Sequence, residues 1–246
     1  MNTDSVWPIT IAGSKRIAME EWAVGVEKNG FAIAQNVFSE SVLSDLLRHI
    51  ADPTLRRSRA GIRHALGVKA ISDLAQENTL IEMARAVLGN EAIPFRATLF
   101  DKSPDSNWLV VWHQDTALPF RKRLDKAGWG PWSIKDGVNY AHAPARALEN
   151  VLALRVHLDD STLENGPLRV LPGTHRSGVL TDDQIEMAVM KASPVDCLVR
   201  KGGVLAMRPL IVHASSKSSG ELPRRVLHIE YASSRHIEND MELAIA

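Results

Sequence analysis

This chain of 246 residues has little cysteine and no net charge. The single cysteine, Cys197, excludes an intrachain disulfide and a zinc cluster built from cysteines. The formal net charge is zero, with 29 basic and 29 acidic residues. Proteins that bind nucleic acids or membrane surfaces in general carry a basic excess. We therefore expect neither nucleic acid nor a membrane as a partner.

Long apolar runs are lacking as well. No window approaches the roughly 18 apolar residues of a membrane-spanning helix. The start, MNTDSVWPIT, has neither the basic region nor the apolar region of a signal peptide. Apolar residues make up 45% of the chain and charged residues 24%, as in ordinary globular proteins. These features predict a soluble protein of the cytoplasm.

The first third of the chain has helical patterns around one short strand. Apolar residues at helical spacing predict a helix over residues 16–28, ended by Asn29-Gly30. A strand over 31–38 follows, and Ser39 is a suitable N-cap for a helix that runs to about His49. Another helix is predicted over 79–88. This pattern is typical of an α layer that packs against a larger unit.

A polar, basic connection lies at 51–70. It allows two interpretations: a flexible basic lip that attracts an acidic substrate, or a loop whose charges are simply solvated. Its basic residues are Arg56, Arg57, Arg59, Arg63, His64 and Lys69.

After residue 92 the pattern changes to short apolar or alternating runs separated by turn residues. About eight such runs predict a sandwich, jelly roll or barrel. Helices first and strands second predict an α+β fold, mainly β, with the helices outside. We expect a single domain (1–246), with a helical layer (1–91), a β core (92–232) and a tail (233–246). The runs are 93–100, 108–113, 151–158, 168–171, 196–199, 204–207, 210–213 and 225–232.

Residues 118–148 interrupt this series of strands. The segment is rich in glycine, proline and large aromatic residues, among them Trp129, Trp132 and Tyr140. Connections this long inside a domain are usually functional or disordered, and the aromatic residues make disorder the less favoured choice. Two interpretations stay open: a lid or substrate wall beside the site, or a packed structural insertion.

The stretch LVVWHQD (109–115) reads as an apolar strand that ends in a His-x-Asp pair. Side chains alternate along a strand, so His113 and Asp115 point to the same side. An imidazole and a carboxylate held in this way form two-thirds of a facial metal site. Alone the pair is weak evidence, because it arises by chance in about half of chains with this composition.

A second histidine and an arginine on later strands complete the pattern. His213 ends the run RPLIVH and supplies the third ligand. Arg224 starts the last long strand, in which Arg224, His228 and Glu230 share one side. Leu227, Ile229 and Tyr231 lie on the other side, which belongs against the helices. The arginine fork suits a carboxylate, so a carboxylate-bearing co-substrate that chelates the metal is expected.

Three segments occur in a characteristic order: WHQD (112–115), LRVHLDDSTLENGPLRVLPGTHRSG (154–178) and HASSKSSGELPRR (213–225). Together they resemble the phytanoyl-CoA dioxygenase family. The run NGFAIAQNVFSESVLSDL is similar to the opening of that family, so the resemblance covers roughly residues 29–232. It implies an oxygenase that depends on Fe(II), 2-oxoglutarate and O2, with a double-stranded β-helix (jelly roll, cupin-like) core.

The resemblance also implies roles for single residues. His113, Asp115 and His213 match the iron ligands. Arg224 matches the arginine that binds the far carboxylate of 2-oxoglutarate. Asp115 also indicates the hydroxylating branch, because halogenating relatives lack this carboxylate. Co-substrate contacts in some members match Lys102 and Arg155.

The substrate is expected to be a small molecule, and the protein a monomer or homodimer. Candidate substrate contacts are Trp129, Trp132, His157 and His228, although a histidine satisfied by a buried neighbour is the simpler interpretation of the last two. His175, in PGTHRSG, is expected to be structural. The turn at Asn165-Gly166-Pro167 is assigned to folding.

Two other functional classes stay open. One is a jelly-roll metal-binding protein without oxygenase activity, which has no need for both the triad and Arg224. The other is a metal-dependent hydrolase or isomerase with the same two histidines and one carboxylate. That enzyme needs a general base, for which Glu230 is the candidate.

Overall fold

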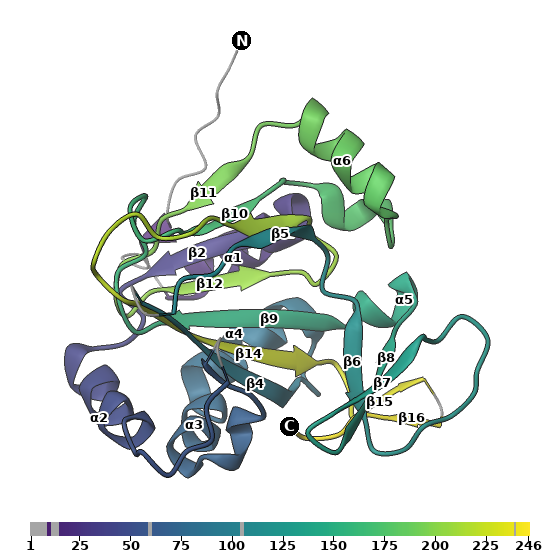
Figure 1. Cartoon of the computed structure of the whole chain (residues 1–246), viewed down its shortest axis with the longest axis horizontal. Coiled ribbons are helices and arrows are strands. Elements are labelled where there is room, and N and C mark those ends of the chain that lie inside the picture. Colours follow the sequence, from purple (N-terminus) through teal and green to yellow (C-terminus); the bar gives the residue numbers. More distant parts are fainter. Residues whose placement is uncertain (1–8, 11–14, 59–60, 104–105, 239) are drawn as a thin grey trace.

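The computed structural model describes residues 9–10, 15–58, 61–103, 106–238 and 240–246. Arg59 of the basic connection and most of the stretch MNTDSVWPIT lie outside the described residues. Two facing β-sheets form the centre of the molecule (Figure 1). The fold is a mainly antiparallel jelly roll with helices outside, which confirms the predicted class.

The larger sheet has seven strands. All of its pairings are antiparallel except that of its first two strands. Their order is β1 (Ile9–Thr10), β2 (Phe31–Gln35), β12 (Val204–Met207), β9 (Val151–His157), β14 (Arg224–Ala232), β4 (Ile93–Lys102) and β3 (Gly61–Ile62). The smaller sheet has the order β11 (Val195–Cys197), β10 (Leu168–Val170), β13 (His213–Ser215) and β5 (Val110–His113).

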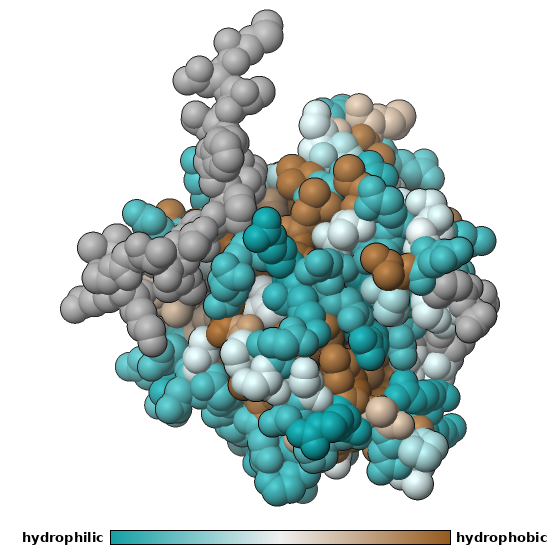
Figure 2. All heavy atoms as spheres, turned by 90° about the vertical axis from the view of Figure 1, so that its left-hand side faces the viewer, coloured by the Kyte–Doolittle hydropathy of each residue, from teal (hydrophilic) through white to brown (hydrophobic). Residues whose placement is uncertain are grey.

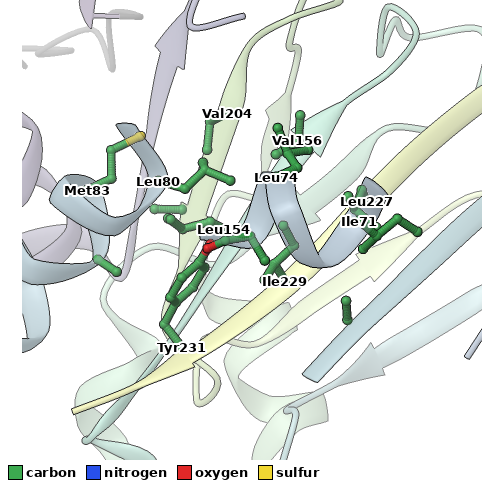
Figure 3. Close-up of a cluster of buried hydrophobic side chains, with 14 of the residues drawn as sticks. Ile71, Leu74, Leu80, Met83, Leu154, Val156, Val204, Leu227, Ile229 and Tyr231 are labelled. Atoms are coloured by element: carbon green, nitrogen blue, oxygen red, sulfur yellow. The ribbon is translucent and has the colours of Figure 1, made fainter. Parts of the chain in front are cut away.

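Helices cover the outer face of the larger sheet. They are α1 (Lys15–Asn29), α2 (Glu40–Ile50), α3 (Lys69–Ala75) and α4 (Asn78–Leu88). In Figure 3, side chains of α3 and α4, such as Leu74 and Leu80, pack on Leu154, Ile229 and Tyr231 of the sheet. Tyr231 is fully buried and donates a hydrogen bond to the Ala75 carbonyl at 2.9 Å. The predicted apolar side of β14 is therefore confirmed.

The inner face of the larger sheet divides into an apolar and a polar part. At the apolar part, Phe31, Leu205 and Met207 pack with Leu168 and Val170 of the smaller sheet. Across β9, β14 and β4 the inward side chains are largely charged or histidine. Because close packing is confined to the apolar part, a cavity is left between the sheets over the polar part.

Residues 118–148 form a small sheet rather than an open loop. Its strands are β6 (Ala117–Phe120), β8 (Val138–His142) and β7 (Trp132–Lys135), followed by α5 (Ala145–Leu148). Phe120 contacts Trp129 edge-on at 5.3 Å between ring centroids, and both pack against Met241 and Leu243. The tail contributes β15 (His236–Glu238) and β16 (Met241–Glu242). This packing favours the structural insertion over the lid.

Several helices lie where the sequence pattern predicts none. The connection 51–70 runs into η1 (Ala65–Gly67) and α3, and η2 (Thr174–Ser177) follows β10. Helix α6 (Asp182–Lys191) begins with a capping box, in which the Thr181 and Gln184 side chains each accept from the other's backbone. No helix within the described ranges is long and apolar enough to span a bilayer. The face in Figure 2 is mostly hydrophilic, with separate apolar patches.

Candidate metal centre

Two neighbouring strands bring the predicted triad together. His113 ends β5 and lies opposite His213, the first residue of β13. Asp115 follows β5. Its Oδ1 lies 3.7 Å from His113 Nε2, and its Oδ2 lies 3.5 Å from His213 Nε2. All three ligand atoms lie within 4.8 Å of one another. The triad predicted from the strand pattern thus forms one compact site.

Backbone hydrogen bonds fix the orientation of both imidazoles. His113 Nδ1 lies 2.8 Å from the Val111 carbonyl and His213 Nδ1 lies 2.9 Å from the Ile211 carbonyl. A carbonyl only accepts, so each Nδ1 carries the proton and each Nε2 keeps its lone pair toward Asp115. This is the tautomer in which histidine binds a metal through Nε2.

Burial and the neighbouring charges set the protonation of the triad. Burial lowers the pKa of His213 to about 4, so this ring is neutral at pH 7. Although burial opposes it, the neighbouring imidazoles of His213 and His113 hold the pKa of Asp115 well below its usual range, so this carboxyl group is ionised. The set therefore offers a carboxylate oxygen and two imidazole nitrogens on one side.

This donor set fits a divalent transition metal. Bonds of about 2.1 Å at right angles need neighbouring donor atoms about 3 Å apart. The observed separations of 3.5 and 3.7 Å exceed that value by less than an ångström. Two histidines and one carboxylate on one face are typical of non-haem Fe(II) sites, which keep open positions for ligands.

Gln114 lies between the two ligands His113 and Asp115 and holds this segment in place. Its side chain is buried and donates to the carbonyls of Gly178 at 2.9 Å and Leu210 at 2.7 Å. Its Oε1 accepts from the Leu180 backbone at 2.8 Å. Alternation along the strand predicts that Gln114 points away from the metal, but no sequence pattern indicates these long-range partners.

We expect Gln114→Leu to lower the free energy of unfolding by about 2–4 kcal/mol, because buried backbone groups lose their partners. Metal affinity is expected to fall about 10- to 100-fold, as for groups that support metal ligands. Urea unfolding and a metal titration measure the two effects. Gln76→Leu, on an exposed glutamine, is the control. Unchanged metal affinity in folded Gln114→Leu would refute the positioning role.

Arg224 lies at the start of β14 and lines the cavity that contains the triad. Its Nε donates to the Asn165 carbonyl and its Nη2 to Ser215 Oγ, each at 3.2 Å. No carboxylate of the described chain lies within 4.0 Å of its guanidinium group. Burial, and then the charge of Arg155, lower the pKa of Arg224 to about 9, so it is cationic at pH 7.

The Asn165-Gly166 turn supports this arginine. The Asn165 side chain holds the turn through the Asp160 carbonyl and the Thr162 backbone N–H, at 2.8 and 2.9 Å. The backbone carbonyl of Asn165 accepts from Arg224 Nε, and the Gly166 carbonyl accepts from Ser215 Oγ at 2.9 Å. The turn assigned to folding therefore also anchors the cation of the site.

Gly166 has no room for a side chain. Its φ is +66°, and a Cβ atom here would lie 2.3 Å from the Ser216 carbonyl oxygen. We expect Gly166→Ala to destabilise the fold by about 2 kcal/mol or more, from left-handed strain plus the clash. Displacement of the turn should also shift Arg224 and weaken binding of a dicarboxylate. Thermal unfolding tests the first effect and calorimetry with 2-oxoglutarate the second. Gly137→Ala, with a similar φ and open space, is the control for strain alone.

Lys102 lies beside Arg224 but does not line the cavity. It pairs across the strands with Arg224, and its Nζ donates to Ser215 Oγ at 3.0 Å and to the Ser216 carbonyl at 2.6 Å. Burial lowers its pKa to about 8. The position supports the loop after β13 and adds positive charge near Arg224.

The remaining polar floor joins β9, β14 and β4. Arg155 lies opposite His228, and its Nη1 donates to His228 Nδ1 at 2.9 Å. Next along β14, Glu230 forms a buried two-point ion pair with Arg96. Burial, and then Arg155, hold the pKa of His228 well below its usual range, so the ring is neutral. These four residues line the same cavity as the triad.

The candidate substrate contacts divide into two groups. His228 lines the cavity, whereas His157 lies deeper, almost completely buried, with neither ring nitrogen hydrogen-bonded. Trp129 and Trp132 are not among the described cavity-lining residues: Trp129 packs in the insertion and donates to Glu238 at 3.3 Å. The structure does not bring these tryptophans to the triad, because their sheet turns toward the tail.

Outside the cavity, the histidine predicted to be structural holds a helix end. His175 Nε2 lies 3.1 Å from the Glu27 carbonyl near the end of α1. A Cβ atom on Gly30 would lie 2.5 Å from its Nδ1. This close contact accounts for the glycine that ends α1.

Part of the basic connection reaches the mouth of the cavity. Arg63 lines it and is exposed. Its neighbour His64 lies 2.9 Å from the Tyr140 hydroxyl and stacks on that ring. Arg56 instead pairs with Asp136 at 3.2 Å. The segment is thus attached to the insertion and places the exposed side chain of Arg63 at the opening.

Two histidines and one carboxylate, held between the two sheets of a jelly roll, place this protein in the class of non-haem metal proteins. A family model described as "Phytanoyl-CoA dioxygenase (PhyH)" matches residues 26–226. The chain belongs to this family.

Curated relatives are distant. The ectoine dioxygenase of Bordetella bronchiseptica is 26% identical over 166 residues, covering 61% of this chain and 47% of that protein. The L-proline trans-4-hydroxylase of Streptomyces griseoviridis is 25% identical over 178 residues, covering 62% and 59%. The chain thus spans about half of the first relative's length and about three-fifths of the second's.

Solved structures share the fold at lower identity. EctD from S. alaskensis with bound Fe has a TM-score of 0.67 at 18% identity, covering 100% of this chain and 83% of that chain. The non-haem alpha ketoglutarate dependent epimerase SnoN from nogalamycin biosynthesis has a TM-score of 0.64 at 19% identity, covering 88% and 83%. These likenesses extend the fold assignment over nearly the whole chain.

Proposed function

We propose that this protein is an Fe(II)- and 2-oxoglutarate-dependent dioxygenase. It hydroxylates, or otherwise oxidises, a small organic metabolite and releases succinate and CO2. The observation that carries the proposal is the pairing of the triad in one cavity with Arg224, a buried guanidinium that has no carboxylate partner among the described residues. The family supports the same function.

In this function His113, Asp115 and His213 hold the iron. Bound iron supplies the activation of O2 and the coordination of the 2-oxo acid. Arg224 binds the far carboxylate of 2-oxoglutarate, with Ser215 Oγ beside it. The two sheets keep water away from the co-substrate, and the Nδ1 hydrogen bonds hold both imidazoles in place during the reaction.

The names of the relatives support a small substrate. Ectoine, L-proline and hypophosphite are named as their substrates. The cavity of about 280 Å³ lies at the lower end of the range for ligand sites. The reacting part of the substrate therefore has to be small. The free thiol of Cys197 supports a cytoplasmic location, because thiols stay reduced in that compartment.

The contacts of Glu230 weigh against a hydrolase or isomerase. Both oxygens of its carboxylate accept from Arg96, so in this arrangement Glu230 serves as the partner of that buried arginine. A protein that only binds metal has no use for Arg224, whose guanidinium is costly to bury without an anion.

Metal and oxygen dependence test the proposal. Purified protein is incubated with 2-oxoglutarate and ascorbate, with Fe(II), Zn(II) or no metal, in air and under argon. Succinate should form only with Fe(II) and O2, and addition of the substrate should increase its rate. A reaction that proceeds under argon, or equally with Zn(II), would contradict the assignment and favour a hydrolase or isomerase.

A further inference from the structure

The cavity contains a second buried guanidinium, that of Arg155. The residue is 6% exposed. Its Nη1 donates to His228, and its Nε is buried without any hydrogen-bond partner. No carboxylate oxygen in the described part of the chain lies within 4.0 Å of it. Buried arginines are normally paired, because an isolated charge is costly in a protein interior. This one is therefore arranged for an anion that the described residues do not supply.

The charges around it leave a positive excess. Arg96 and Glu230 neutralise each other. Arg155 and Arg224, which line the cavity, then outnumber the carboxylate of Asp115, and Lys102 lies beside the cavity as a further cation. If the proposed function holds, Fe(II) and the 2-oxoglutarate dianion add equal and opposite charges. One positive charge among these cavity-lining groups remains uncompensated with both of them bound.

Position separates the roles of the two arginines. Arg224 is fixed by Asn165 and Ser215 at the start of β14. Arg155 lies opposite His228, four residues further along that strand, a separation of about 13 Å between backbones. A 2-oxoglutarate that spans from Arg224 to the metal uses both of its carboxylates. Arg155 itself lines the cavity, so its guanidinium group remains available to a second anion there.

We propose that Arg155 binds a carboxylate of the primary substrate, so that the substrate is a small carboxylic acid. This inference rests on the proposed function and specifies the substrate class for the same site. Arg63 at the mouth adds a cation on the path of such an anion. An arginine fork holds a carboxylate at two points and thereby fixes the orientation of the attached carbon chain at the metal.

Acetate is a direct probe of this site. Mn(II) replaces Fe(II), because carboxylate and imidazole ligands accept it, and 2-oxoglutarate is kept at saturation. The relaxation rate of acetate methyl protons is then measured by NMR, with acetamide as the neutral, equally sized comparison. Acetate should relax at least about tenfold faster than acetamide in the wild type. Acetate in Arg155→Gln should relax no faster than acetamide.

Arg225→Gln is the matched control. Arg225 is on the neighbouring strand β14, on the side of the sheet opposite to Arg224, and its guanidinium is paired with Asp159 at 2.8 Å. This variant should keep the acetate effect, and Arg155→Lys should keep part of it through its charge. Equal acetate relaxation in wild type and Arg155→Gln would overturn the proposal. So would a loss of 2-oxoglutarate affinity in Arg155→Gln as large as in Arg224→Gln, since Arg155 would then be a co-substrate anchor. If the wild type does not bind 2-oxoglutarate at all, the proposed function itself fails.

Discussion

Asp115→Ala should lose Fe(II) binding and all metal-dependent turnover while keeping its fold. The carboxylate is the only anionic ligand of the triad, and both histidines are oriented by backbone carbonyls that the substitution leaves in place. Loss of a group that merely supports a ligand costs about 10- to 100-fold in metal affinity, so loss of the ligand itself should cost more than about 100-fold. Metal content after dialysis and a competition titration with a chelator measure the effect.

Asp115→Asn is the control for size. It keeps the volume and the backbone contact between the Asp115 N–H and the Pro209 carbonyl at 2.9 Å, but it removes the charge. Both variants should unfold at denaturant concentrations close to that of the metal-free wild type. Fe(II) binding by Asp115→Ala at wild-type affinity would show that the metal is held elsewhere.

Arg224→Gln is expected to abolish tight binding of 2-oxoglutarate without loss of the metal. Removing one partner of a buried, hydrogen-bonded charge pair costs about 2–5 kcal/mol, or roughly 30-fold or more in Kd. The metal ligands are not hydrogen-bonded to Arg224, so Fe(II) affinity should stay within about threefold. Calorimetry with 2-oxoglutarate on the metal-loaded variant gives the first value, and metal titration gives the second.

A monocarboxylic co-substrate separates loss of the charge pair from loss of the fold. Pyruvate has the chelating 2-oxo acid but lacks the far carboxylate. It should bind the wild type and Arg224→Gln with similar, weak affinity. If Arg224→Gln binds 2-oxoglutarate as tightly as the wild type does, Arg224 is not part of the co-substrate site.

Local sequence patterns predicted the helices and strands that have a strong apolar periodicity of their own. The helix expected over 79–88 is α4, and the alternation in β14 correctly divided Tyr231 from Arg224. Helix α6 was missed, although its TDDQ start is a capping box, because its weak apolar stripe covers only a narrow contact with β5 and its surroundings. The strand expected over 31–38 ends earlier, at Gln35, because the next residue, Asn36, has a φ of +57°.

The metal triad was predictable because its chemistry limits the residue types and its strands limit the directions. The supporting groups were not. Gln114 reaches partners 64 and 96 residues away, and the anchor of Arg224 is the carbonyl of Asn165, which any residue possesses. The two tryptophans suggested a substrate wall, but their burial against the tail depends on contacts between distant segments. Such pairings are properties of the folded chain, so sequence spacing does not reveal them.

The most direct test of this account is the metal dependence of 2-oxoglutarate binding. Under argon, 2-oxoglutarate is titrated into metal-free protein, into protein loaded with Fe(II), and into Fe(II)-loaded Arg224→Gln. Tight binding of one equivalent is expected only for the Fe(II)-loaded wild type, since chelation and the Arg224 contact are both required. Equal binding with and without metal, or no binding to the Fe(II)-loaded protein, would contradict the assignment of this site to 2-oxoglutarate-dependent oxidation.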